Sequence, residues 1–185
     1  MTVRSRDARA QLQAAPRPPA PAGARRQGVV TPIVGLRVLF IHGPNANLSG
    51  LAGKPNPRRV TFDQICERCR RAAEGSAVAL DFRQGHSEGD LVDAIQQAIG
   101  TMDGLIIDGG SLASTSIAVL DALQSFPGPI VEVQTDNVHR RDPSRPGASY
   151  LSRAATGIIG GLGVDGCELA VLAMRRLLDR PKTKT

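Results

Sequence analysis

Short apolar runs alternate with longer amphipathic stretches along most of this sequence. Each run is long enough for one strand, and each is followed by the polar residues, Gly or Pro that end strands. The runs span residues 36–41, 78–82, 104–108, 129–133 and 155–159. Strands separated by segments of helical length are typical of a parallel sheet with helices on both faces. The pattern predicts an α/β domain over residues 35–180, built on a five-stranded parallel sheet.

The stretches between the runs carry apolar residues three or four positions apart, which predicts amphipathic helices. The first helix begins after Thr61 and ends near Gly75, and the last covers Glu168 to Leu178. Two further helices are marked by the apolar sets Leu91, Ile95 and Ile99, closed by Gly100, and Ile117, Leu120 and Leu123, ended before Pro127. Because crossovers between parallel strands are right-handed, few topologies remain.

Three loops of this domain are the most polar and the richest in Gly and Pro. They follow the first, third and fourth strands, over residues 43–51, 108–116 and 134–145. Ligands of open parallel sheets bind beyond the carboxyl ends of the strands, where the strand order reverses. We therefore expect these loops to meet at the functional site.

The positive charge belongs mainly to the N-terminal segment. The chain has a net charge of +6, and residues 1–34 contribute +5 of it through six Arg against one Asp. That segment has no apolar periodicity, so we interpret it as a disordered basic tail, with organelle targeting or weak polyanion contact as alternatives. Residues 181–185 form a short basic C-terminal tail. Nucleic-acid binding by the domain itself is not expected.

The remaining composition excludes several classes of site. Cys66 and Cys69 form a CxxC pair without a second pair of ligands, and we interpret them as buried or half-buried helix positions. The three cysteines make no disulfide framework, so a reducing cytoplasm is the default. No run approaches the roughly 18 apolar residues that a membrane helix needs. The glycine pairs at 109–110 and 160–161 lack the spacing of a nucleotide fingerprint.

Several phrases along the chain resemble the type II 3-dehydroquinate dehydratases. They occur in the family's order across residues 36–178, at His42–Leu48, Asp81–Asp93, Thr115–Leu123, Val131–Val133, Ser149–Ser152 and Ala155–Gly163. The resemblance implies a flavodoxin-like three-layer sandwich and a carbon–oxygen lyase of the shikimate pathway, which supplies aromatic amino acids. It also implies a cytoplasmic homo-oligomer, trimer or dodecamer, that uses no metal or organic cofactor.

The resemblance assigns roles to five residues that this chain retains. Asn45 matches the Asn that stabilises the enolate intermediate, and Glu132 matches the residue that supports the catalytic acid. Arg145 matches a hydroxyl-binding Arg, and Arg141 is its partner in the lid. Asp121 matches an acid that approaches the neighbouring subunit's site. These residues form the inherited half of the predicted site.

The other half of the family's site is replaced. The replacements are Ala52 for the loop Arg, Pro57 for the Tyr base, Gln134 for the His acid, Ser114 for a second His, Asp108 for an Asn and Asp136 for the carboxylate-binding Ser. Gly110 and Thr135 complete the expected substrate-binding set. The single tyrosine, Tyr150, lies far from the loop in sequence, so no shift of the alignment restores the base.

These replacements change the expected chemistry. Gln134 cannot deliver a proton, and losing one positioned acid or base typically costs about 10²–10⁴-fold in rate. Asp108, Asp136 and His42 are the candidates for a new base, whereas both Asp residues can also be read as solvated loop residues. Asp136 would repel a substrate carboxylate by roughly 4 kcal/mol at about 4 Å, for an effective dielectric of 20.

Three functions remain open from the sequence. A dehydration or isomerisation of a different small cyclic substrate, a polyol or ketone, is the main hypothesis. The alternatives are a genuine 3-dehydroquinate dehydratase with an unorthodox site and an inactive paralogue that acts as a structural or regulatory partner.

Overall fold

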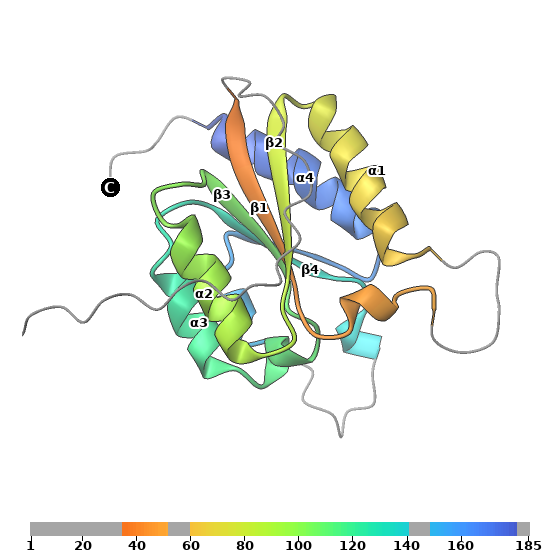
Figure 1. Ribbon diagram of the computed structural model, residues 1–185, viewed down its shortest axis with the longest axis vertical. Coiled ribbons are helices and arrows are strands. Elements are labelled where there is room, and N and C mark those ends of the chain that lie inside the picture. Colours follow the sequence, from red (N-terminus) through yellow and green to blue (C-terminus); the bar gives the residue numbers. More distant parts are fainter. Residues whose placement is uncertain (1–34, 52–59, 141–148, 181–185) are drawn as a thin grey trace, which may run out of the picture. The chain divides into compact units, whose positions relative to one another are not determined.

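The computed structural model describes residues 35–51, 60–140 and 149–180 (Figure 1). Its five strands are β1 (Leu36–His42), β2 (Val78–Gln84), β3 (Gly104–Asp108), β4 (Ile130–Gln134) and β5 (Gly157–Gly160). They form one parallel sheet in the order β2-β1-β3-β4-β5. The predicted α/β class, the parallel sheet and its five strands are confirmed.

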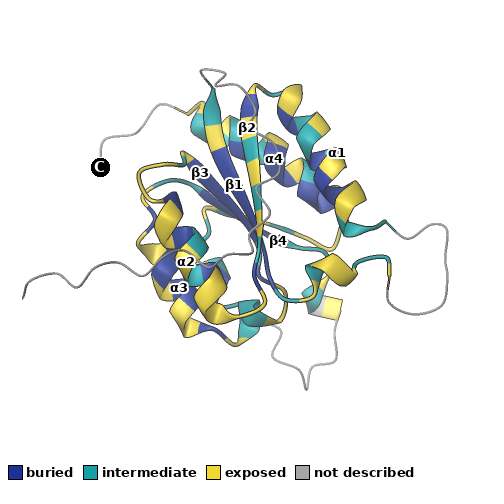
Figure 2. Ribbon diagram, in the orientation of Figure 1, coloured by how far each residue is buried: buried dark blue, intermediate teal, exposed yellow. Residues whose placement is uncertain are grey.

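Four helices cover the two faces of the sheet. Helices α1 (Phe62–Glu74) and α4 (Asp165–Leu178) pack on one face, and α2 (Glu88–Ala98) and α3 (Ile117–Gln124) pack on the other (Figure 1). Successive strand residues point to opposite faces of the sheet. Val38 and Phe40 therefore pack in the core under α1 and α4, while Leu39 and Ile41 pack in the core under α2 and α3. The centre of the sheet is consequently buried on both sides (Figure 2).

Two of the helices begin at capping boxes. In α1 the Thr61 side chain accepts the N–H of Gln64, and the Gln64 side chain accepts the N–H of Thr61. Ser87 and Asp90 make the same reciprocal pair at the start of α2. These bonds satisfy backbone donors that a helix N-terminus otherwise leaves unpaired, and they fix where each helix starts.

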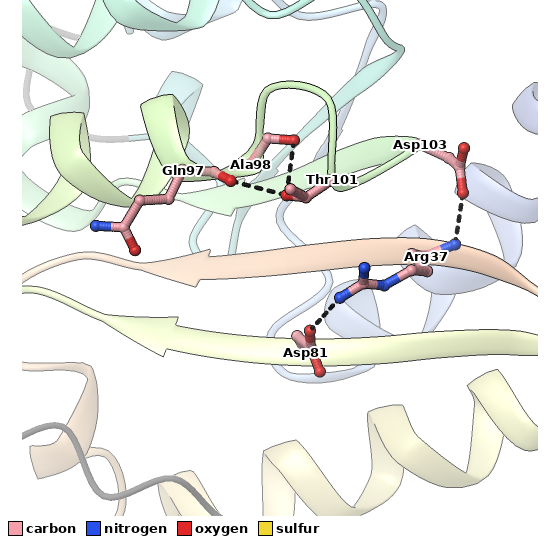
Figure 3. Close-up of polar contacts among 6 residues, drawn as sticks. All are labelled: Arg37, Asp81, Gln97, Ala98, Thr101 and Asp103. Atoms are coloured by element: carbon pink, nitrogen blue, oxygen red, sulfur yellow. Dashed lines mark hydrogen bonds and ion pairs between the residues drawn. The ribbon is translucent and has the colours of Figure 1, made fainter. Parts of the chain in front are cut away.

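Polar contacts also fix the connection from α2 into β3, at the amino ends of the strands (Figure 3). The backbone N–H of Arg37 donates to Asp103 Oδ2 at 2.7 Å, and the Arg37 guanidinium lies 3.7 Å from Asp81 Oδ2. Thr101 Oγ1 donates to the carbonyl oxygens of Gln97 and Ala98 at 2.7 and 3.2 Å. The two contacts of Arg37 tie β1 to β2 and to the segment that enters β3.

Three sequence-based expectations about the helices need correction. The last helix begins at Asp165, three residues before the predicted Glu168. Ile99 follows α2 in extended backbone and is 41% exposed. Ile117, the first residue of α3, is 51% exposed. Periodicity cannot separate the end residues of a helix from its buried middle, because their side chains project past the edge of the packed face.

All three cysteines occupy core positions, which confirms the interpretation of Cys66 and Cys69 as buried helix residues. Cys66 and Cys69 lie inside α1 and Cys167 inside α4, and all three thiols are free and buried. Burial raises the pKa of Cys66 to about 11 and that of Cys69 to about 12. Within the described ranges, no group of three or more His, Cys, Asp or Glu is arranged to hold a metal ion. No helix in those ranges is long and apolar enough to cross a membrane.

The two predicted tails, residues 1–34 and 181–185, lie outside the described residues. Their interpretation as a disordered basic segment and a short basic terminus stays a prediction.

Candidate active site

A cavity of about 380 Å³ lies beyond the carboxyl ends of β1, β3 and β4. Its lining comes from the segments that follow these three strands, over residues 43–46, 108–114 and 133–138, together with Ser149. The sheet order reverses between β1 and β3, so the cavity occupies the place that the fold reserves for ligands. The three predicted loops do meet at one cavity.

The loop after β1 is held against the loop after β3 by a backbone contact. The N–H of Gly43 donates to the carbonyl oxygen of Asp108 at 2.7 Å. A Cβ at Gly43 would lie only 2.3 Å from the carbonyl oxygen of Gly109, so no other residue fits there without displacing the backbone. Asn45 follows with φ of 66° and lines the cavity just before a short 3₁₀ turn, Ala46–Leu48.

Asp108 is the last residue of β3, and its carboxyl group is partly buried in the cavity wall. Its Oδ1 accepts the N–H of Gly110 at 3.2 Å. Burial raises the pKa of Asp108; the Gly110 hydrogen bond opposes this shift, and the nearby Glu132 carboxylate adds to it. A carboxylate whose pKa is raised by desolvation is a stronger proton acceptor than one in water.

Glu132 lies beneath the cavity, at the middle of β4, and is completely buried. Its Oε1 accepts Nε2 of Gln134 at 3.0 Å, and its Oε2 accepts the hydroxyl of Ser152. Ser152 lies in a 3₁₀ turn, Leu151–Arg153, that follows residues 141–148. Sequence reasoning placed Ser152 in a family phrase but gave it no function, because only the fold brings it to Glu132.

The family assignment follows from comparison with known proteins. The model of the family "Dehydroquinase class II" matches residues 36–175. The chain belongs to the class II dehydroquinase family. A solved type II dehydroquinase from Butyrivibrio crossotus superposes with a TM-score of 0.70 at 26% identity, covering 76% of this chain and 98% of that one.

Family members with the name 3-dehydroquinate dehydratase align over nearly their whole length. The Photobacterium profundum protein is 43% identical, covering 76% of this chain and 94% of its own. The Tolumonas auensis protein is 40% identical, covering 78% and 94%. The Aliarcobacter butzleri protein is 33% identical, covering 80% and 89%. The shared name of these relatives is that of a lyase.

Most of the predicted site residues that the structure describes gather at the cavity. Its lining includes Asn45, Asp108, Gly110, Ser114, Gln134, Thr135 and Asp136, and Glu132 supports Gln134 from below. Asp121 lies exposed on α3 and is not among the lining residues of its own chain. Arg141 and Arg145, like Ala52 and Pro57, lie outside the described residues.

His42 was an incorrect choice as a candidate base. It is only 2% exposed and does not line the cavity. Its ring stacks on Phe40 at 4.2 Å between centroids and meets the edge of Phe62 from α1 at 5.0 Å. Burial lowers the pKa of His42 to about 4. It follows Phe40 by two residues in β1, so it points to the same face of the sheet and into the core under α1.

The described lining offers carboxyl groups for proton transfer and amides for hydrogen bonding. Asp108 and Asp136 supply carboxyl groups, and Asn45 and Gln134 supply amides. Such a set can take a proton from carbon and stabilise an enolate by hydrogen bonding.

Proposed function

We propose that this dehydroquinase-family protein forms an enolate on a small cyclic ketone other than 3-dehydroquinate, for example a polyhydroxylated ring ketone, in a dehydration or isomerisation. The observation that carries the proposal is Asp108, a partly buried carboxyl group with a raised pKa in the cavity wall. Asp108 would supply a base that the chain otherwise lacks, because Pro57 stands at the sequence position of the family's Tyr base.

Asp108 would act as the general base. Its carboxylate takes a proton from the carbon next to the ketone, the C–H bond breaks, and the electron pair forms the carbon–carbon double bond of the enolate. The charge moves to the carbonyl oxygen, to which the Asn45 amide would donate a hydrogen bond. Neither step requires a metal or an organic cofactor.

The charge of the cavity supports a substrate without a carboxylate. Asp136 stands where the resemblance places a carboxylate-binding Ser, and Asp108 lies in the same wall. Two unit charges at about 4 Å repel by roughly 4 kcal/mol for an effective dielectric of 20. A neutral ring avoids this repulsion, whereas 3-dehydroquinate does not.

Exchange of substrate hydrogen for deuterium tests the proposal directly. The protein in deuterated buffer is incubated with a panel of neutral ring ketones, and proton NMR follows loss of the signal next to the carbonyl. We expect catalysed exchange that Asp108→Asn lowers by at least about 10²-fold. Exposed Asp63, on α1, provides the control Asp63→Asn, which should leave the rate unchanged. Exchange that is equally fast with Asp108→Asn would contradict the proposal.

A second candidate, 3-dehydroquinate dehydratase activity, is favoured by the names of relatives that are 33–43% identical. Its test is the ultraviolet absorbance of the conjugated enone that forms when 3-dehydroquinate loses water. A rate well above buffer would replace the first candidate. Absence of both reactions would leave the inactive-paralogue function, a structural or regulatory partner.

We also infer that the protein works in the cytoplasm as a homo-oligomer, a trimer or a dodecamer. Three buried free thiols suit a reducing compartment. The exposed position of Asp121 suits a residue that serves a neighbouring subunit.

A further inference from the structure

The outward side of α4 carries two leucines where a surface helix normally carries polar residues. Leu169 and Leu172 are each 43% exposed in the middle of this helix. The exposed residues of α1 and α2 are polar or glycine: Asp63, Gln64, Glu67, Arg71 and Glu74 on α1, and Glu88, Gly89, Asp90, Asp93, Gln96 and Gln97 on α2. A polar outer side is typical of a helix that packs only against its own sheet, so the leucines of α4 indicate a further contact.

The two leucines are the centre of a stripe that runs along α4. The members of this stripe, four, three and four positions apart, are Asp165, Leu169, Leu172 and Arg176. This spacing repeats every seven residues and brings all four side chains to one side of the helix. The residues that α4 buries lie on its other side, toward the sheet and α1: Gly166, Cys167, Ala170, Val171 and Met174. The stripe therefore faces away from its own domain.

The order of residues in the stripe is complementary to itself when two copies of α4 lie antiparallel. Its midpoint falls between Leu169 and Leu172, so a two-fold axis there brings Leu169 of one copy opposite Leu172 of the other. The same axis brings Asp165 opposite Arg176 at both ends. A parallel pair would instead align each charge with its like, which is unfavourable. The antiparallel pair thus combines an apolar centre with two ion pairs.

Both charged ends of the stripe are available to a partner. Arg176 is exposed and makes no ion pair with any residue that the structure describes. Asp165 pairs with Arg68 of α1, yet its side chain remains 70% exposed. Arg68 also pairs with Glu168, so it holds the Asp165 carboxylate at the end of the stripe without covering it.

We infer that the α4 stripe binds the same stripe of a second copy of this chain about a two-fold axis. The inference rests on the proposed homo-oligomer and is independent of the enolate chemistry. A contact of this kind joins chains in twos, so the assembly has an even number of chains. It admits a dodecamer and excludes an isolated trimer. Eleven residues of helix span only about 16 Å, so we expect a contact that single substitutions can break.

Sedimentation velocity with a charge at the centre of the stripe tests the inference. We expect the native protein to contain an even number of chains and Leu172→Glu to dissociate into a smaller species, because it places two carboxylates in the apolar centre. Ile99→Glu provides the control, since Ile99 is 41% exposed at the end of α2 and should leave the native size unchanged. A native monomer, an odd number of chains, or a Leu172→Glu protein of native size would overturn the inference.

Exchange of the two charges tests the antiparallel register. Arg176→Glu should weaken the two-fold contact about 10-fold, since two ion pairs become two repulsions. Adding Asp165→Arg should restore most of the affinity, and Glu168 still pairs with Arg68 in that protein. Both charges are then unfavourable for the macrodipole of α4, so thermal unfolding is measured alongside to show that each variant is folded. A double variant that associates no better than Arg176→Glu would show that these charges do not meet.

Cross-linking locates the contact on α4 itself. Chains with Leu169→Cys are mixed with chains with Leu172→Cys, dissociated, reassembled and oxidised. The native thiols are buried, so the introduced ones react first. We expect disulfides between the two kinds of chain in higher yield than for Leu169→Cys mixed with Gln97→Cys, on the exposed side of α2. Equal yields would place the contact elsewhere. None of these measurements depends on turnover, so failure of this inference is distinguishable from failure of the proposed chemistry.

Discussion

Asn45 adopts a left-handed backbone conformation, with φ of 66°, at the edge of the cavity. Asn tolerates this region, whereas a residue with an ordinary Cβ loses about 1–2 kcal/mol there. We expect Asn45→Ala to lower the free energy of unfolding by about 1 kcal/mol, as measured by urea denaturation. Asn45→Gly should preserve stability to within about 0.5 kcal/mol because glycine accepts positive φ. Both variants should slow deuterium exchange, since both lose the amide.

Exchange at the native rate in Asn45→Gly would contradict a role of the amide in stabilising the enolate. Greater loss of stability in the glycine variant than in the alanine variant would contradict the backbone argument.

His42 makes stability depend on pH. Burial lowers its pKa to about 4 in the folded protein, from an unfolded value of 6.5. The unfolded chain therefore binds a proton at a higher pH than the folded one, and the free energy of unfolding falls as the pH drops from about 6.5 to 4. The full loss is on the order of 3 kcal/mol. Chemical denaturation across this range should show a shallower pH dependence for His42→Phe.

The exposed His86 provides the matched control for that measurement. His86→Phe should follow the pH profile of the native protein. If His42→Phe keeps the native slope, carboxylate titration accounts for the acid sensitivity and the buried imidazole does not.

At the residue scale, the sequence predicted which residues lie at the carboxyl ends of the strands, but it did not predict which way each side chain points. Asn45, Asp108 and Gln134 follow or end strands, and the carboxyl ends of parallel strands meet at one edge, so their meeting could be predicted. His42 also ends a strand, but alternation turns it away from the cavity and into the core. Ser152 contacts a residue 20 positions earlier, a separation that no local pattern reveals.

At the element scale, the contact between the β1 and β3 loops depends on Gly43. A Cβ there would meet backbone atoms of Gly109 at 2.3 and 2.6 Å, and backbone cannot rotate away as a side chain can. We expect Gly43→Ala to cost about 1–3 kcal/mol of stability, by overpacking. Deuterium exchange should also fall, because the displaced loop carries Asn45 away from Asp108.

Gly157 offers a control on the same sheet. No atom lies within 4 Å of a Cβ built on this β5 residue, so Gly157→Ala should be close to neutral in thermal unfolding. A Gly43→Ala protein as stable as the native one would show that the two loops separate freely.

The elements themselves were predictable because each apolar run has a strand's length and each helical stretch has a buried stripe. The strand order, β2-β1-β3-β4-β5, came from the structure, because right-handed crossovers reduce the possible topologies without selecting one. The ends of the helices were harder to predict from the sequence. Asp165 starts α4 ahead of its first apolar residue, and Ile99 has the helical spacing but lies beyond the last turn of α2.

At the scale of the whole molecule, sequence and structure inform different parts of the chain. The charge of +5 on residues 1–34 is visible only in the sequence, because these residues lie outside the described ranges. The cavity is visible only in the fold, because its lining comes from segments up to about a hundred residues apart. Whether another chain completes the cavity is a question of assembly, and it concerns Asp121.

Asp121 is exposed on α3 and does not line its own chain's cavity, yet the family resemblance assigns it to a neighbouring site. We expect sedimentation velocity to give a species of three or twelve chains. Asp121→Asn should then slow deuterium exchange without changing the cavity of its own chain. Mixing chains that carry Asp108→Asn with chains that carry Asp121→Asn, after dissociation and reassembly, should restore part of the rate. Some mixed interfaces then combine a native Asp108 with a native Asp121 from the other chain. A monomer, or a mixture without recovered activity, would show that each cavity works alone.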